Sequence, residues 1–291
     1  MKLEYNILWI EDDKNWIRVP KKKIERAITD FGFIPNIRIV NDCNLDDINL
    51  YECDMIFVDY NLDTCTPRQY GNIILESLQS KNIYTDAIFY SSSNIDDLYS
   101  KVKDSNLLNI SVLPRDVFNP ENINQVINII KYFLKKDLDL NTMRGIMLSE
   151  VAKFDNRIWN IIEKIKNQSE IIEYIKQKKN EQKDVFDKYT ESQLWKILTD
   201  IETSTIHFSS GMRGTYLKKS LDVLSKKDDK YNSLYEIAKT YYDEIIIIRN
   251  SLAHREKVTS DDEENFIQIR KNIIKHKENI ENISNIIETD V

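Results

Sequence analysis

The residue types best suited to chemistry lie near the C-terminal end of the chain. There an apolar run, Ile245–Ile248, leads directly into Arg249 and Asn250, and His254 follows four residues after the asparagine. Residues four apart share a face of an α-helix, so Asn250 and His254 point the same way if this segment is helical. Histidine titrates nearest neutral pH and suits acid–base catalysis, while arginine is a permanently charged fork for phosphate oxygens. These residue types suit metal-independent cleavage of RNA, with asparagine orienting the ribose or the phosphate.

The pattern Arg-Asn-x-x-x-His resembles the signature of the HEPN superfamily, small helical domains of which many are metal-independent ribonucleases. The resemblance implies that Arg249, Asn250 and His254 are catalytic, with no metal needed for cleavage and products ending in a 2′,3′-cyclic phosphate. It also implies a homodimer in which two motifs face each other across a two-fold axis. Arg255 and Lys257 follow the motif and are candidates for steering the RNA backbone.

A structural interpretation of the same motif stays open. Arg249 could pair with a carboxylate, and His254 could end a helix, where a cation interacts favourably with the helix dipole. HEPN domains without catalytic activity also exist, and they act as binding or dimerisation modules.

Acidic side chains form a second group of candidates in the first half of the chain. Glu11 and Asp12 follow one apolar run, and Asp59 follows another. In an open parallel sheet, ligands bind at the carboxyl ends of the strands, where these side chains would meet. Carboxylates at adjoining strand ends repel one another unless a hard cation lies among them, and Mg²⁺ suits such oxygen ligands.

This arrangement resembles the receiver domain of two-component response regulators. The resemblance implies that Asp59 is the phosphoacceptor and that a sensor histidine kinase is a partner. It further implies that Glu11, Asp12 and Asp59 hold Mg²⁺ together with the backbone carbonyl of Asn61. Ser91, which directly follows the apolar run Ala87–Tyr90, would be the switch hydroxyl. The alternative is that these acids are solvated loop residues and helix caps.

The chain departs from the receiver pattern at one position. Receivers carry a lysine at the end of the fifth strand, but here the segment reads Leu113-Pro114-Arg115 and has no lysine. Arg115 is the candidate substitute for the missing cation, although arginine and lysine differ in geometry. Without such a substitute the unit would be a pseudo-receiver that is not phosphorylated.

Proline divides the chain, since all five prolines precede residue 121. In the proline-containing part, apolar runs alternate with segments whose apolar residues have helical spacing. This alternation predicts a flavodoxin-like parallel α/β domain over residues 1–136. The proline-free remainder predicts an all-α helical bundle over residues 137–291. The expected strands are Tyr5–Ile10, Ile34–Val40, Met55–Val58, Ala87–Tyr90 and Ile110–Leu113. The expected helices are Trp16–Asp30, Gln69–Ser80, Ile95–Lys103, Pro120–Leu134, Asp139–Lys179, Ser192–Phe208, Tyr216–Leu224, Tyr231–His254 and Asp261–Ile287.

Several local expectations accompany this division. The join Tyr132–Thr142 lacks glycine and proline, so we expect a continuous helix there. Gly211 and Gly214 are expected to mark a turn between two helices. His207 is expected to be packed among apolar residues, whereas His276, in a helix rich in lysine and glutamate, is expected to face solvent.

Charge and composition narrow the function classes. The net charge is −7; residues 1–140 carry 16 Lys and Arg against 22 Asp and Glu, and residues 141–291 carry 25 against 26. An acidic chain without a basic recognition helix argues against sequence-specific DNA binding, so any RNA must bind locally in the second half. The three scattered cysteines suggest a reducing compartment. Because no apolar run could span a bilayer and no signal peptide is evident, we expect a cytoplasmic protein with no membrane partner.

The sequence thus predicts a signal-controlled, metal-independent endoribonuclease. Its helical dimer site would be regulated by a receiver domain phosphorylated at Asp59, in a stress response or in defence against phage. The alternative is a non-catalytic response regulator whose helical domain mediates dimerisation or binding of a partner protein. Substitution of His254 discriminates between the two, because only the enzyme depends on that side chain for RNA cleavage.

Overall fold

The computed structural model describes residues 2–41, 45, 48–63, 69–92, 94–165, 190, 193, 210–254 and 262–289. The chain divides into two compact units, Lys2–Asp137 and Leu138–Val291, and each has its own core. Among the described residues, no helix combines the length and the apolar character needed to cross a membrane.

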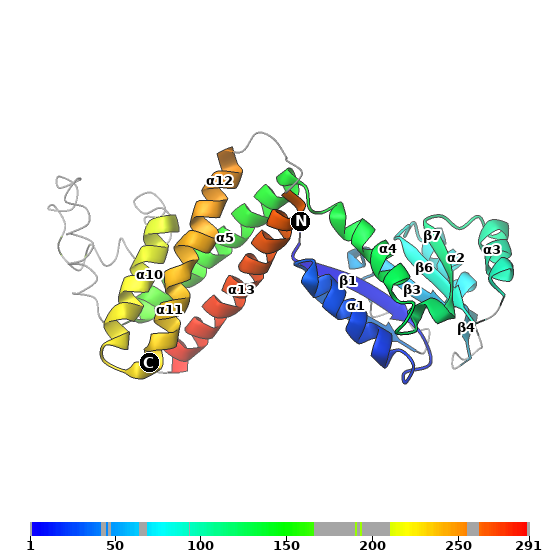
Figure 1. The fold of residues 1–291 in the computed structure, drawn as a ribbon, viewed down its shortest axis with the longest axis horizontal. Coiled ribbons are helices and arrows are strands. Elements are labelled where there is room, and N and C mark those ends of the chain that lie inside the picture. The colour runs from blue at the N-terminus through cyan, green and yellow to red at the C-terminus, as the bar shows by residue number, and fades with distance from the viewer. Residues whose placement is uncertain are drawn as a thin grey trace. The chain divides into compact units, whose positions relative to one another are not determined.

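The first unit is built on a five-stranded parallel sheet with the strand order β2-β1-β3-β6-β7 (Figure 1). This order is that of flavodoxin-like doubly wound folds, so the predicted fold class is confirmed. A short antiparallel pair, β4 (Asn61–Leu62) and β5 (Gln69–Tyr70), follows β3. The sheet strands are β1 (Glu4–Ile10), β2 (Ile34–Val40), β3 (Met55–Asp59), β6 (Ala87–Ser91) and β7 (Ile110–Pro114).

Helices cover both faces of the sheet, as a parallel sheet requires. On one face α1 and α4 contact each other, and Trp9 packs its ring edge-on against Phe57, 4.9 Å between centroids. On the other face, α2 and α3 bury leucine and isoleucine side chains against alternate residues of the same strands. The helices are α1 (Arg18–Asp30), α2 (Gly71–Ser80), α3 (Ile95–Asp104) and α4 (Asn124–Lys135).

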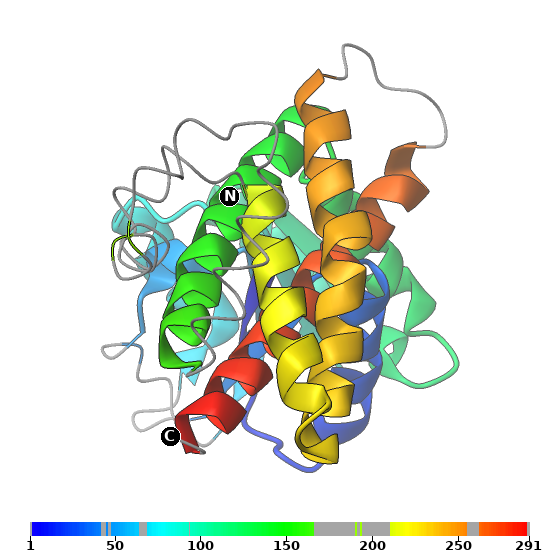
Figure 2. The same ribbon diagram turned by 90° about the vertical axis from the view of Figure 1, so that its left-hand side faces the viewer.

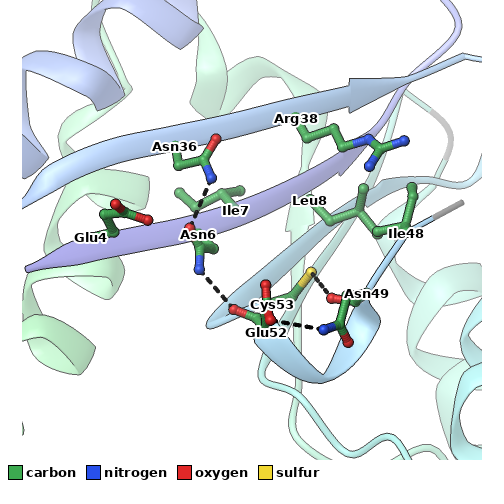
Figure 3. A pocket seen from close by; sticks show the side chains of 10 residues that line it. All are labelled: Glu4, Asn6, Ile7, Leu8, Asn36, Arg38, Ile48, Asn49, Glu52 and Cys53. Atoms are coloured by element: carbon green, nitrogen blue, oxygen red, sulfur yellow. Dashed lines mark hydrogen bonds between the residues drawn. The ribbon is translucent and has the colours of Figure 1, made fainter. Parts of the chain in front are cut away.

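The described part of the connection from β2 to β3 covers the sheet with less helix than the other connections between neighbouring strands do. Its described residues contain one 3₁₀ turn, η1 (Leu50–Glu52), and no α-helix. A pocket of about 290 Å³ lies there, where Figure 3 shows Asn36 bonded to Asn6 and Asn6 bonded to the backbone oxygen of Glu52. These polar groups satisfy one another. The pocket also lies toward the start of β1, away from the carboxylates that follow its end.

The second unit is helical throughout its described part (Figure 2). The long helix α5 contacts α10, α12 and α13, so it forms the centre of the packing. The predicted segment Tyr231–His254 is one helical run that changes from α to π and back to α. Such π-helical turns are rare and occur frequently at functional sites. The elements are α5 (Leu140–Lys164), α10 (Ser210–Ser225), α11 (Asn232–Tyr241), the π-helical η5 (Tyr242–Ile247), α12 (Ile248–His254) and α13 (Asp262–Thr289).

The predicted continuous helix across the join is wrong. The helix α4 ends at Lys135, and α5 begins at Leu140. Asp139 starts the new helix, because its carboxylate accepts hydrogen bonds from the backbone N–H groups of Asn141 (2.9 Å) and Thr142 (3.1 Å). This N-cap interrupts the helix although the segment has neither glycine nor proline.

The predicted turn at Gly211 and Gly214 is also wrong, since both lie inside α10. A Cβ atom on Gly214 would lie 2.8 Å from the Tyr241 ring, and one on Gly211 would lie 3.1 Å from the Tyr242 ring. The glycines therefore allow close approach of another helical segment instead of breaking a helix. The predicted helix Ser192–Phe208 and His207 lie outside the described residues, apart from position 193.

Candidate functional sites

The acidic residues predicted to meet at the strand ends do so. Carboxylate oxygens of Glu11, Asp12 and Asp59 all lie within 4.8 Å of one another. The parallel pairing of β1 with β3 causes this, because Ile10 lies opposite Val58 and the next residue of each strand carries an acid. Glu11 and Asp59 are buried, and Asp12 is partly exposed.

Arg115 reaches this cluster from the 3₁₀ turn η2 (Arg115–Phe118), which follows β7. Its Nη1 atom lies 3.3 Å from Oδ2 of Asp59, and its Nη2 atom lies 3.2 Å from Oε1 of Glu11. The guanidinium stacks over the Trp16 ring, 4.1 Å from the ring centroid. Arg115 is therefore a cation within reach of the predicted phosphoacceptor, held in place by an aromatic residue that the sequence analysis did not select.

A chain of hydrogen bonds from buried aromatic side chains holds the Glu11 carboxylate in place. The Tyr90 hydroxyl donates to Oε2 of Glu11 (2.8 Å), and the Trp9 indole N–H donates to the Tyr90 oxygen (2.7 Å). The backbone N–H of Asp13 donates to Oε1 (2.9 Å). Neither Tyr90 nor Trp9 was predicted at the site. Both occupy strand positions that sequence alone assigns to the core.

Burial and mutual repulsion raise the affinity of these acids for protons. Burial, followed by the neighbouring charge of Glu11, raises the pKa of Asp59 to about 7, although Arg115 opposes the shift. Burial also raises the pKa of Glu11. Among the described residues, Oδ1 of Asp59 is buried without a hydrogen-bond partner. A cluster with excess negative charge and an unpaired carboxylate oxygen fits a hard divalent cation such as Mg²⁺.

The other residues predicted for this site lie nearby. The side-chain amide of Asn61 donates to the Ser91 hydroxyl (3.3 Å), and Ser91 is buried at the end of β6. A pocket of about 420 Å³ opens beside them. Its lining comprises Trp16, Ser91, Ser92, Pro114, Arg115, Asp116 and Asn119.

The start of α2 packs closely against the end of β3, which carries Asp59. A Cβ atom on Gly71 would lie 2.2 Å from the backbone oxygen of Asp59 and 2.7 Å from Val58 Cγ1. The Gly71 N–H donates to the carbonyl of Tyr60 (2.9 Å). Only glycine fits this position without a shift of the backbone.

The second predicted site lies on α12. Asn250 and His254 are exposed there, and Arg249 is partly exposed. The Nη2 and Nε atoms of Arg249 donate to the Asn250 side-chain oxygen, at 2.8 and 3.2 Å. The Arg144 Nε atom donates to the carbonyl of Leu252 (2.8 Å), so α5 anchors the last turn of the motif helix. Arg255 and Lys257 lie outside the described residues.

Arg249 also contacts α10, through a bond from Nη1 to the Ser210 hydroxyl (3.1 Å). Ser210 in turn donates to Oδ2 of Asp155 on α5 (2.6 Å), which also pairs with Arg213 (3.4 Å). Among the described residues, no carboxylate lies within ion-pair distance of Arg249, so the direct pairing considered above is not observed there. Neither Ser210 nor Asp155 was selected from the sequence.

The prediction that His276 faces solvent is wrong. The side chain is fully buried between α13 and η5, and its Nε2 atom lies 2.8 Å from Oε2 of Glu244. Its ring meets that of buried Tyr241 edge-on, 5.6 Å between centroids. Burial lowers the pKa of His276, although Glu244 opposes the shift. Its neighbours Lys275 and Glu278 are exposed, and Lys275 also pairs with Glu244 (2.9 Å).

No protein-family model matches the sequence, and no curated protein is significantly similar to it. Several solved structures have a fold similar to part of the chain. One is the receiver domain of the Francisella response regulator 1452, with 20% identity and a TM-score of 0.35, covering 46% of this chain and 98% of that one. Another is the signal receiver domain of a putative LuxO repressor protein from Vibrio parahaemolyticus, with 18% identity, a TM-score of 0.35, and coverage of 46% and 92%. A third is the response regulator DrrB, an OmpR/PhoB homologue from Thermotoga maritima, with 17% identity, a TM-score of 0.34, and coverage of 46% and 54%.

Proposed function

We propose that this chain is a signal-controlled, metal-independent endoribonuclease whose α/β unit is a receiver phosphorylated at Asp59. The observation that carries the catalytic part is the placement of Asn250 and His254 on an exposed helix end, with Arg249 bonded beside them. The observation that carries the regulatory part is the cluster of Glu11, Asp12 and Asp59.

In the helical unit, His254 exchanges protons with the 2′-hydroxyl or the leaving 5′-oxygen. Arg249 stabilises the charge that develops on the pentacovalent phosphate, and Asn250 orients the ribose or the phosphate. One motif supplies a single histidine for two proton transfers. A homodimer that brings a second motif across a two-fold axis supplies the other one.

In the α/β unit, Glu11, Asp12 and Asp59 would hold Mg²⁺ together with the backbone carbonyl of Asn61. The ion would supply positive charge for the phosphoryl oxygens. Arg115 takes the role of the lysine found in receivers, since it already reaches Asp59. Ser91 is the switch hydroxyl, and the pocket beside Arg115 admits the phosphohistidine side chain of the phosphodonor, a sensor histidine kinase.

Phosphorylation of Asp59 is proposed to change how two chains associate, and so whether two motifs face each other. A second candidate function is a non-catalytic response regulator whose helical unit only binds protein. The exposed apolar side chains of Tyr242 (45% exposed) and Ile247 (49% exposed), close to the motif, favour it, because they suit a protein partner.

The decisive experiment measures RNA cleavage by the full-length chain in EDTA, comparing wild type with His254→Ala and Arg249→Lys. Ser251→Ala, which alters an exposed residue at a variable position of the same motif, is the matched control. We expect cleavage by wild type and the control, with loss in the two motif variants while size-exclusion profiles stay unchanged. Analysis of the product ends should detect 2′,3′-cyclic phosphates.

A wild type that is inactive in EDTA is tested again with Mg²⁺ and an acyl phosphate, with Asp59→Asn as the control. Activity that appears only with an intact Asp59 identifies a latent enzyme. Inactivity of the phosphorylated protein, or equal cleavage by His254→Ala, rejects the nuclease in favour of the protein-binding module.

A further inference from the structure

The contacts behind Arg249 connect three helices that lie far apart in the sequence. Asp155 lies on α5, Ser210 opens α10, and Arg249 lies in α12. The chain of hydrogen bonds runs from Arg249 Nη1 to the Ser210 oxygen (3.1 Å), and from the Ser210 hydroxyl to Asp155 Oδ2 (2.6 Å). Because a hydroxyl has one proton, donating it to Asp155 directs an oxygen lone pair of Ser210 at Arg249.

We infer that Asp155 and Ser210 are positioning residues that orient the Arg249 guanidinium for a phosphate. Neither one touches the substrate. The inference rests on the proposed function in so far as the phosphate belongs to RNA.

The two hydrogen bonds from Arg249 through Ser210 to Asp155 form a relay. Buried charge keeps this relay in one orientation. Asp155 is 7% exposed, and Arg213, its ion-pair partner, is 4% exposed. Burial raises the pKa of Asp155, while the Ser210 hydroxyl, Arg213 and Arg249 oppose the shift. The cations around Asp155 favour its charged form, which accepts the Ser210 proton instead of donating one of its own.

The relay holds Arg249 in place and leaves N–H donors of its guanidinium available for a phosphate. Within the described residues, its bonds occupy one N–H on each of Nε, Nη1 and Nη2. Since each Nη carries a second N–H, one donor remains on each for bidentate contact with a phosphate. A carboxylate in place of the Ser210 hydroxyl would compete with the phosphate for those donors. The intervening hydroxyl fixes the guanidinium and leaves its charge available.

The kinetic test compares the full-length wild type with Ser210→Ala and Ser210→Thr. The matched control is Ser220→Ala, which removes a different hydroxyl of α10, one that is buried and donates to the Tyr216 carbonyl (2.8 Å). We expect kcat for RNA cleavage to fall about 100-fold in Ser210→Ala, because small misplacements of a catalytic group are costly. The KM value should change little, because the arginine acts mainly on the transition state. The threonine variant should recover most of the activity, and the control should keep it.

A second measurement is independent of cleavage. The hydrogen-exchange rate of the Arg249 Nε–H, assigned by its loss in Arg249→Lys, reports how firmly the guanidinium is held. We expect faster exchange in Ser210→Ala and Asp155→Asn, with wild-type rates in Ser210→Thr and Ser220→Ala.

The two measurements separate failure of the relay from failure of the proposed function. Faster exchange in Ser210→Ala together with an inactive wild type supports the relay and rejects the nuclease. An unchanged exchange rate in Ser210→Ala overturns the relay, whatever the activity. Equal kinetic losses in Ser210→Ala and Ser220→Ala also overturn it, since they would reflect general damage to α10.

Discussion

The two candidate sites carry opposite arrangements of charge. In the α/β unit, three carboxylates, Glu11, Asp12 and Asp59, lie around one arginine. In the helical unit, two arginines lie around the single carboxylate of Asp155. The first arrangement lacks positive charge and suits a cation, whereas the second has an excess of it and suits an anion such as a phosphate. The sign of the charge in excess therefore differs between the two clusters, and this difference is what the two proposed roles, metal binding and phosphate binding, depend on.

The sites also differ in how the backbone creates them. Parallel strands bring Glu11 and Asp59 together through sheet register, which depends on local sequence pattern. Asp155 and Arg249 are linked through Ser210 only because separate helices pack closely. The first site should therefore fail when the strand ends are displaced, and the second when the helices are separated.

Gly71→Ala should produce the largest effect and tests the first half of this comparison. The new Cβ would lie 2.2 Å from the Asp59 backbone oxygen, so β3 or α2 must move. We expect the α/β unit to lose about 3 kcal/mol of stability, at the upper end for overpacking. Hydrogen–deuterium exchange of the full-length chain should show faster exchange in β3 and α2 and an unchanged helical unit. Equal exchange rates in β3 and α2 of wild type and Gly71→Ala would contradict the tight contact.

Asp59→Asn tests whether the carboxylate cluster lacks positive charge. A pKa raised to about 7 means that ionising Asp59 destabilises the fold, so stability is lost as pH rises through that value. In EDTA at pH 8, the variant should be more stable than wild type by about 2 kcal/mol. Added Mg²⁺ should stabilise the wild type more than the variant.

The control for that experiment is Asp30→Asn, which alters an exposed acid at the end of α1. Thermal unfolding in EDTA and in Mg²⁺ measures all three proteins. A variant less stable than wild type in EDTA would mean that the ion pair with Arg115 outweighs the repulsion from Glu11.

Gly214→Ala is the corresponding substitution in the helical unit and tests the second half of the comparison. The nearest atoms belong to the Tyr241 ring, at 2.8 and 3.1 Å, and a ring adjusts more easily than a backbone oxygen. Alanine also favours helix by about 1 kcal/mol, which offsets part of the clash. We therefore expect a net loss of about 1 kcal/mol, smaller than at Gly71. Exchange rates in α10 and α11 would measure it, and a loss equal to that of Gly71→Ala would contradict the ranking.

The smallest expected effect is the contribution of His276 to the pH dependence of the stability of the helical unit. Its lowered pKa means that the folded unit favours the neutral ring, whereas the unfolded chain binds a proton below about pH 6.5. Stability of the helical unit should thus fall as pH drops through that value, by less than about 1 kcal/mol, because Glu244 partly compensates. Lys275 also pairs with Glu244, with 2.9 Å between Nζ and Oε2. Unfolding between pH 7.5 and 5.5 should show a shallower slope in His276→Gln, and an equal slope would exclude His276 as the cause.

Sequence pattern predicted the α/β unit well because its central strands, such as β3 and β6, are buried on both faces. Continuous apolar runs ended within one residue of the strands found, and acids following those runs had to meet at one edge of the sheet. Arg115 was selected for its place after the fifth strand, and its side chain does reach Asp59. Trp16 was missed because its stacking on Arg115 depends on a loop whose path the sequence does not specify.

The helical unit was predicted less well, because its determining contacts are distant in sequence. Gly211 and Gly214 resembled a turn, since the Tyr241 and Tyr242 rings that require small residues come from another helix. His276 is buried and pairs with Glu244, 32 residues earlier in the chain, which no local pattern reveals. One signal for Asp155 was present: it falls next to Phe154 on the buried stripe of α5, where an acid requires a partner.

The close approach at Gly211 and Gly214 also makes the distance between helices adjustable by mutation. Ser210 immediately precedes this pair, so the thickness of one methyl group on α10 would be transmitted directly to the distance from Ser210 to Arg249. Side chains that carry no functional group would therefore adjust how the Arg249 guanidinium is placed. Directed evolution of activity should therefore sample small residues on α10 before it alters the arginine or the histidine.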